Sequence, residues 1–242
     1  MVLFLLAACS PPPTIPPPPT PVAVRVLATD LTEPLLLDLA AAYARVSPSV
    51  AVVPGRALAP GAGAALAAGE ADLALTSMPA TGFFATPLAY ARLAVVVHPA
   101  NAVNALSEAQ VRALFAGDIG DWAQVGGAAG PVQVVAPAPG GEAEALFTQQ
   151  VLAGAAPTVS ALVAPGWDAM RTLVGDDPNA LGYLPAAELS GAVRVLDQPA
   201  ELRALVVAVA ITEPVGPARD FLAWAQSAAG QAVVAERYEP LE

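Results

Sequence analysis

The chain has 242 residues, of which 56% are hydrophobic and 13% charged, so it can bury a sizeable core and is not a disordered chain. All ten basic residues are arginine, and 21 Asp and Glu residues give a net charge of −11. This excess of negative charge argues against nucleic acid as a partner and against electrostatic docking on an anionic lipid surface.

The first nine residues have the form of a signal-peptide end, because an apolar run leads into small residues. The run is too short for a membrane-spanning helix, which needs about 20 apolar residues. The order Leu6-Ala7-Ala8-Cys9 resembles a bacterial lipobox, whose cysteine becomes the lipidated first residue of the mature protein. We therefore expect residues 1–9 to be a signal peptide with a lipobox and Cys9 to carry a lipid anchor. A chance cysteine in an apolar leader is the alternative.

Residues 10–21 are rich in proline, which blocks helices and central strands. We expect this stretch to be an extended, semi-rigid tether that holds a folded domain away from a membrane. A ligand for SH3-type domains is the alternative interpretation.

From Val22 onward, apolar strand patterns alternate with helical patterns. Strands are expected at residues 22–28, 49–53, 72–76, 90–97 and 132–135, and helices at 61–68 and 142–152. A further helix is expected to start at 32–34 and to carry Leu36, Leu39, Tyr43 and Val46, and another to follow Ser107 and to carry Val111, Leu114 and Phe115. Thr32 and Ser107 stand where a helix cap is expected, since a hydroxyl can accept a bond from the free N–H groups of the first turn. The alternation predicts an α/β fold with largely parallel sheets.

Several runs of sequence together resemble the phosphate-binding proteins of bacterial phosphate ABC transporters. The strongest are ARLAVVVHPAN at 91–101, LSEAQV at 106–111 and LFAGDIGDWAQVGG at 114–127. Further runs are GEADLA at 69–74, LGYL at 181–184 and the C-terminal segment 218–241. The resemblance covers residues 22–241 in order.

This resemblance implies a two-lobed periplasmic binding protein fold of type II, with two discontinuous lobes joined by two hinge strands. Residues 22–94 and 188–242 would form the first lobe and residues 95–187 the second, with 90–97 and 181–184 crossing between them. Together with the lipobox at Cys9, it predicts an exported, monomeric lipoprotein facing the periplasm or the cell exterior. The protein would hold phosphate or another oxyanion between the lobes and hand it to an ABC permease in the membrane.

Three segments should then line the cleft. In chain order, the candidate ligand-binding residues are Thr29, Asp30, Leu31 and Thr32, then Asp72 and Ser77, and finally Gly140 and Gly141. Thr32 could cap the following helix or contact the ligand. Asp72 could accept a proton from a protonated oxyanion, and the two glycines would offer backbone N–H groups.

The resemblance weakens at the groups that would bind an anion. Asp30 stands where the family has a neutral hydroxyl, Glu142 and Glu144 follow the two glycines, and no arginine occupies the family's position. Only a distant arginine, such as Arg56 or Arg171, could reach the cleft. We therefore predict weak or no phosphate binding. An altered site in a non-transport accessory or sensory lipoprotein, or a cationic or neutral polar ligand, is the alternative.

Catalysis is not expected. His98 is the only histidine and follows a strand beside a proline, where a structural role is favoured. The sequence has no nucleophile motif of the Gly-x-Ser-x-Gly kind and no clustered metal ligands, so we expect neither a cofactor nor a metal.

Overall fold

A computed structural model describes residues 21–58, 61–197 and 202–241. The predicted signal peptide, Cys9 and all but the last residue of the predicted tether lie outside the described residues.

The described residues form strands and helices in alternation, and most of the bounds expected between residues 22 and 152 are close to the observed ones. The strands are β1 (Val22–Ala28), β2 (Val50–Arg56), β3 (Leu73–Thr76), β4 (Phe84–Val97), β5 (Gln133–Pro137), β6 (Leu162–Ala164), β7 (Ala180–Pro185), β8 (Arg194–Val195) and β9 (Arg203–Ala210). The helices are α1 (Glu33–Val46), α2 (Ala62–Ala67), α3 (Glu108–Ala116), α4 (Glu142–Gln150), α5 (Trp167–Asp176), α6 (Gly216–Gln226) and α7 (Ala228–Val234).

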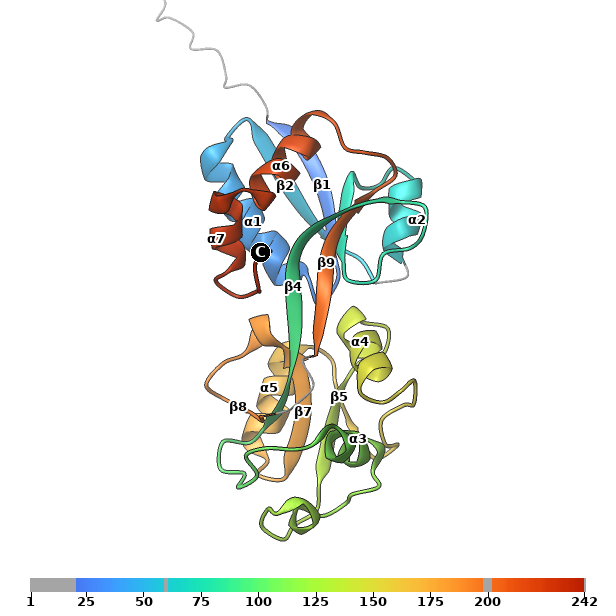
Figure 1. Cartoon of the computed structure of the whole chain (residues 1–242), viewed down its shortest axis with the longest axis vertical. Coiled ribbons are helices and arrows are strands. Elements are labelled where there is room, and N and C mark those ends of the chain that lie inside the picture. The colour runs from blue at the N-terminus through green and yellow to red at the C-terminus, as the bar shows by residue number, and fades with distance from the viewer. Residues whose placement is uncertain (1–20, 59–60, 198–201, 242) are drawn as a thin grey trace, which may run out of the picture.

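The elements gather into two lobes, which confirms the two-lobed α/β fold. The first lobe holds β1 to β3 with α1, α2, α6 and α7, and the second holds β5 and β7 with α3, α4 and α5 (Figure 1). Strands β4 and β9 run from one lobe to the other. The strand order is β2-β1-β3-β9-β4-β7-β5-β6. Strand β1 is parallel to its neighbours β2 and β3, and β5 is parallel to β6 and β7, but the pairing around β4 and β9 is antiparallel. The sheet is therefore mixed and not largely parallel.

One predicted hinge strand is wrong. Segment 181–184 belongs to β7, which pairs with residues 93–97 at the second-lobe end of β4. The chain then passes through β8, which pairs with Val96 and Val97 of the same lobe. It returns to the first lobe only through β9, which pairs with residues 84–92 of β4. The second crossing is therefore β9, and the stretch from 188 to 197 lies with the second lobe. The first predicted crossing, 90–97, is part of β4.

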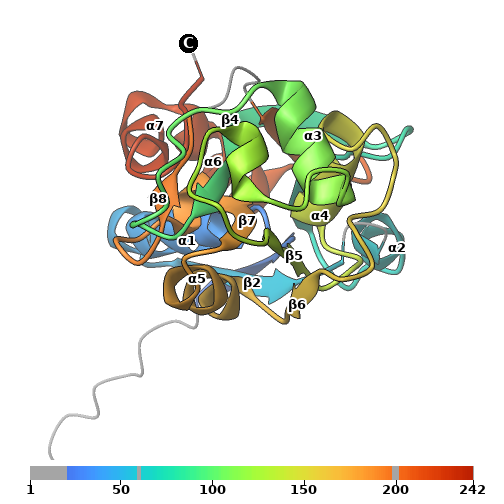
Figure 2. The same cartoon turned by 90° about the horizontal axis from the view of Figure 1, so that it is seen from below.

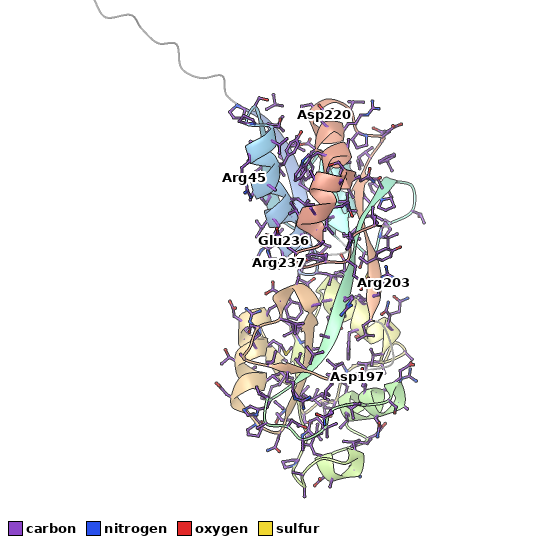
Figure 3. The ribbon with its side chains drawn as sticks, turned by 60° about the vertical axis from the view of Figure 1, so that its left-hand side comes forward. Arg45, Asp197, Arg203, Asp220, Glu236 and Arg237 are labelled. Atoms are coloured by element: carbon purple, nitrogen blue, oxygen red, sulfur yellow. The ribbon has the colours of Figure 1, made fainter. Side chains whose placement is uncertain are left out.

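The two crossing strands are held together where they leave the first lobe. Arg203 lies between the two lobes (Figure 3). Its guanidinium is 3.6 Å from the centre of the Tyr90 ring and pairs with Glu239 at 2.8 Å. The backbone N–H of Tyr90 also donates to the carbonyl of Glu239. Cation–π and ion-pair contacts of this kind tie the C-terminal segment to the junction between the lobes.

Helices cover both faces of the second-lobe sheet (Figure 2). Met170 and Val174 of α5 pack on one face, in a cluster with Leu184. On the other face, Phe147 of α4 stacks on Tyr183, with ring centres 3.7 Å apart and planes within 5°. Side chains alternate across a strand, so neighbouring residues of β7 serve the two cores. Helix α3 begins with the expected cap, in which Ser107 and Gln110 form a capping box.

Candidate functional site

A cavity of about 620 Å³ lies between the two lobes. Its charged lining residues are Asp30, Glu33, Arg56, Asp168, Arg171 and Glu188. The other lining residues come from both lobes and are small or apolar, with Trp167 the largest of them. A second cavity of about 330 Å³, lined mostly by apolar groups such as Met78 and Phe83, lies beside it. Gly141 lines both cavities, so the start of α4 stands between them.

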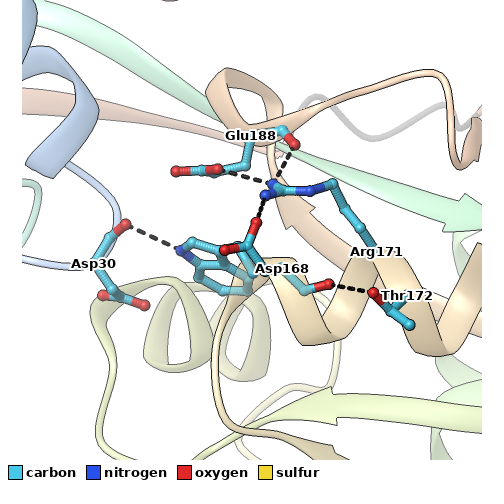
Figure 4. Close-up of polar contacts among 6 residues, drawn as sticks. Asp30, Asp168, Arg171, Thr172 and Glu188 are labelled. Atoms are coloured by element: carbon cyan, nitrogen blue, oxygen red, sulfur yellow. Dashed lines mark hydrogen bonds and ion pairs between the residues drawn. The ribbon is translucent and has the colours of Figure 1, made fainter.

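The side chain of Asp30 extends from the first lobe to the start of α4 in the second lobe. Its carboxylate Oδ1 accepts a hydrogen bond of 2.7 Å from the backbone N–H of Glu142. Its carbonyl accepts one of 3.3 Å from the indole N–H of Trp167 (Figure 4). Burial raises the pKa of the Asp30 carboxyl, against the opposing effect of the backbone N–H groups of Glu142 and Ala143. Asp30 therefore caps a helix of the opposite lobe.

The side chain of Glu142 extends in the opposite direction, from the second lobe to the end of β3 in the first lobe. Its side chain is fully buried, and its Oε2 accepts a hydrogen bond of 2.8 Å from the hydroxyl of Thr76 at the end of β3. Its Oε1 accepts a bond from the backbone N–H of Ser77. Nearby, the N–H of Gly140 donates to Glu144 at 3.3 Å. Carboxylates of the protein thus accept hydrogen bonds from backbone N–H groups on both sides of the cleft.

A family model described as a PBP superfamily domain, PBP standing for periplasmic binding protein, matches residues 16–228. The chain belongs to this superfamily.

Solved structures share the fold at low sequence identity. One is described as a phosphate ABC transporter substrate-binding protein with bound phosphate from Clostridium perfringens, with a TM-score of 0.82 and 20% identity, covering 91% of this chain and all of that one. An ABC-type phosphate transport receptor from Vibrio cholerae has a TM-score of 0.76 and 22% identity, covering 90% and 100%. The reduced form of OxyR from N. meningitidis has a TM-score of 0.66 and 16% identity, covering 91% and 99%. At these identities the likeness shows a common PBP fold.

Four of the expected site residues meet at the cleft of this PBP fold. Asp30, Gly140 and Gly141 line its cavities, and the N–H of Ser77 reaches Glu142 from the first lobe. The hydroxyl of Ser77 is buried and has no hydrogen-bond partner in the described part of the chain. A side chain at position 141 would collide with Asp30, because an added Cβ would lie 2.5 Å from its Oδ2. Glycine at this position therefore allows the carboxylate to reach the helix.

The other residues of the first predicted segment serve the interior of the first lobe. Thr32 directs its hydroxyl to the carbonyl of Leu75 at 2.9 Å and accepts the N–H of Thr29 at 3.0 Å. Leu31 is fully buried, and its carbonyl accepts the hydroxyl of Tyr238. Helix α1 does follow Thr32, but the hydroxyl makes no capping bond. Since these groups satisfy one another, Thr29, Leu31 and Thr32 fix the turn that presents Asp30.

Asp72 lies at the wrong end of its strand to join the cleft. It precedes β3, whereas Thr76 and Ser77, at the other end, face α4. A strand of four residues separates its two ends by roughly 13 Å. The Asp72 carboxylate instead pairs with Arg25 at 3.0 Å and borders a surface recess with Val22. The structure therefore assigns Asp72 to an ion pair at the far edge of the sheet.

We predict that Asp72→Asn changes the pH dependence of stability and leaves the cleft unaltered. Hydrogen bonding and charge from Arg25 hold the pKa of the Asp72 carboxyl below its usual range. The folded state then binds fewer protons at this site than the unfolded state, so the stabilisation is present above about pH 4 and is lost as the pH falls through the folded-state value. Urea unfolding between about pH 6 and pH 3 should show a steeper loss in the wild type than in the variant. Equal slopes would contradict this assignment.

The two distant arginines both reach the cavity, where each already has a carboxylate partner. Arg56 pairs with Glu33 at 2.5 Å. Arg171 pairs with Glu188 at 2.9 Å and also with Asp168 (Figure 4). Counting the lining side chains, four carboxylates face two guanidinium groups. The cavity therefore carries a surplus of negative charge.

Trp167 is a cavity residue that the sequence interpretation missed. It opens α5 directly after Gly166, and both line the cavity. An aromatic residue following glycine at a helix start was the signal in the sequence.

His98 lies outside the residues that line this cavity. Its ring accepts a hydrogen bond from the N–H of Ala100 at 3.0 Å, in keeping with a structural role.

Metal ligands do not cluster in the described part of the chain. No three His, Cys, Asp or Glu side chains among those residues gather in a way that could hold a metal ion. No helix within the same ranges is both long enough and apolar enough to cross a membrane.

Proposed function

We propose that the protein is an extracytoplasmic solute receptor that holds a small ligand between its lobes and delivers it to an ABC permease. The observation that carries this proposal is the 620 Å³ cavity bounded by both lobes, with two crossing strands as the connection between them. A cavity of this size suits a small molecule. The neighbours described as phosphate transport receptors support the same role. The protein acts by binding and not by catalysis.

The ligand that we propose is a small polar solute that is neutral or carries positive charge. The resemblance and the two transport neighbours suggest phosphate or another oxyanion instead. Against an oxyanion stand the four cavity carboxylates and the ion-paired state of Arg56 and Arg171. A buried anion needs donors for nearly all its oxygens, since unpaired buried charge is very unfavourable. The indole of Trp167 supplies a flat apolar wall for such a solute.

A thermal-shift screen tests this function directly. The panel contains inorganic oxyanions, amines and amino acids, and sugars. A ligand at a hundred times its Kd stabilises the folded state by about 2.7 kcal/mol, which gives a clear rise in Tm. We expect one of the polar neutral or cationic classes to raise the Tm in a concentration-dependent manner. A panel without any such rise would favour the second candidate function.

That second candidate is an accessory or sensory lipoprotein that no longer carries solute. It is favoured by the hydrogen bonds that the carboxylates of Asp30 and Glu142 accept from the opposite lobe, because the protein's own side chains occupy these donors and join the lobes. The fold is also shared with OxyR from N. meningitidis, whose description names no transport role.

For anchoring, we predict that Cys9→Ser releases the protein from the membrane fraction as a soluble or unprocessed form. The proposal is supported by the Leu6-Ala7-Ala8-Cys9 order and the proline-rich stretch after it. Fractionation of cells expressing the wild type and the variant measures the distribution, with metabolic lipid labelling as the second readout. A variant that sediments with membranes as the wild type does would contradict the anchor.

A further inference from the structure

The donor groups of the cleft are those that an oxyanion would need. The start of α4 offers the N–H groups of Glu142 and Ala143, and the end of β3 offers the N–H of Ser77 and the hydroxyl of Thr76. N–H groups at a helix start are unpaired within the helix and lie at the positive end of its dipole. Donors from both lobes therefore converge on one region.

These donors are already used by two carboxylates of the chain. Asp30 of the first lobe accepts the Glu142 N–H of the second, and Glu142 of the second lobe accepts donors of the first. Helix α4 has no side-chain cap of its own, since Gly141 stands at its N-cap. A helix cap from the same loop would require no contact between lobes. In this protein the cap exists only while the lobes are together.

Two buried hydroxyls, those of Tyr183 and Ser77, make no hydrogen bond within the described part of the chain. Tyr183 on β7 is fully buried, and its hydroxyl makes no hydrogen bond among the described residues. Burial, followed by the negative charges of Glu144 and Asp30, raises the pKa of this hydroxyl. The buried hydroxyl of Ser77 is likewise without a partner in the same ranges. At Ser77, an unused hydroxyl donor therefore belongs to the same residue whose N–H binds Glu142, while carboxylates outnumber guanidinium groups in the larger cavity.

We propose that Asp30 and Glu142 are specificity-determining residues, whose carboxylates stand in for an oxyanion and keep phosphate and similar anions out of the cleft. An entering oxyanion would have to displace a carboxylate from its N–H donors and would then lie beside its charge. Arg171 is mostly buried and already pairs with Glu188, and Arg56 pairs with Glu33 from a mostly exposed position. This inference rests on the proposed function in one respect, that the cleft is the solute site.

The test is calorimetric titration of inorganic phosphate at low salt into the wild type and into Asp30→Ser/Glu142→Ser. Serine removes both charges and supplies hydroxyl donors. We expect no binding heat from the wild type up to about 1 mM phosphate, and an affinity at least tenfold higher in the double variant. The matched control is Glu70→Ser/Asp220→Ser, which removes the same two residue types from exposed positions; Asp220 lies at the end of the first lobe away from the cleft (Figure 3). This control should behave like the wild type.

Two results would overturn the proposal. Tight phosphate binding by the wild type would show that the carboxylates do not exclude oxyanions, although the cleft would remain a solute site. A folded double variant without any gain in phosphate affinity would show that the released donors do not form an anion site.

Where thermal melting shows the double variant to be unfolded, Asp30→Asn and Glu142→Gln take its place, because they remove the charge and keep the shape. Higher phosphate affinity in either variant supports the proposal. If both variants are folded and neither binds phosphate more tightly than the wild type, the proposal is rejected. The solute screen decides the transport role separately.

Discussion

Replacing Phe147 by alanine is expected to lower the free energy of unfolding by about 3–5 kcal/mol. The Phe147 ring is fully buried, is stacked on Tyr183 and has a second edge contact with Phe115, whose ring centre is 4.7 Å away. Truncation removes apolar surface from the core and leaves a cavity that rigid aromatic neighbours cannot refill. Urea unfolding followed by far-UV circular dichroism measures the loss.

The control for this variant is Val159→Ala, because Val159 is fully exposed. A surface truncation of this kind is expected to change the unfolding free energy by less than about 0.5 kcal/mol. Equal effects of the two substitutions would contradict the position of the aromatic cluster at the centre of the second lobe.

Gly230→Ala is the second substitution with a large expected effect, through crowding in the first lobe. An added Cβ at Gly230 would lie 2.3 Å from the carbonyl oxygen of Trp224 and 2.5 Å from that of Ala225. Both are backbone atoms, so helices α6 and α7 would have to separate. We expect a loss of about 3 kcal/mol, at the upper end for overpacked sites.

Gly191→Ala is the matched control, since an added Cβ there meets no atom within 4 Å. Alanine at an open position restricts the unfolded chain and should leave stability unchanged or slightly higher. A Gly230→Ala protein that melts like Gly191→Ala would show that α6 and α7 are packed less closely than the structure has them.

Local patterns predicted most of the elements between residues 22 and 152. The strand at Val22–Ala28 and the helix starting after Thr32 follow from apolar runs and periodicity, and both are present. The capping box at Ser107 is likewise a local signal, confined to four neighbouring residues. Such elements could be predicted because their hydrogen bonds and packing are determined by residues close in sequence.

The second hinge could not be predicted in the same way. Residues 181–184 and strand β9 are both short apolar runs, and either could serve as the crossing on pattern alone. The choice depends on which half of β4 each one pairs with, and this long-range register leaves no local mark. The antiparallel pairing around β4 was missed for the same reason.

The candidate site was only partly predictable from sequence. Asp30, Gly140 and Gly141 follow strand ends, and side chains at strand ends meet at one edge of a sheet. Asp72 was misplaced because it precedes its strand. The acids Glu142 and Glu144 were seen as opposed to anion binding, but a sequence cannot show that Glu142 reaches Thr76, 66 positions away in the chain.

Tryptophan fluorescence tests most directly whether a solute binds in the cavity between the lobes. Trp167 is the tryptophan in the interlobe cavity, and its indole also bonds to Asp30. For any solute that raises the Tm in the screen, we predict a change in tryptophan emission with the same Kd, absent in Trp167→Phe. An emission change of equal size in that variant, or stabilisation without any change in the wild type, would place the solute outside the cleft and contradict the account.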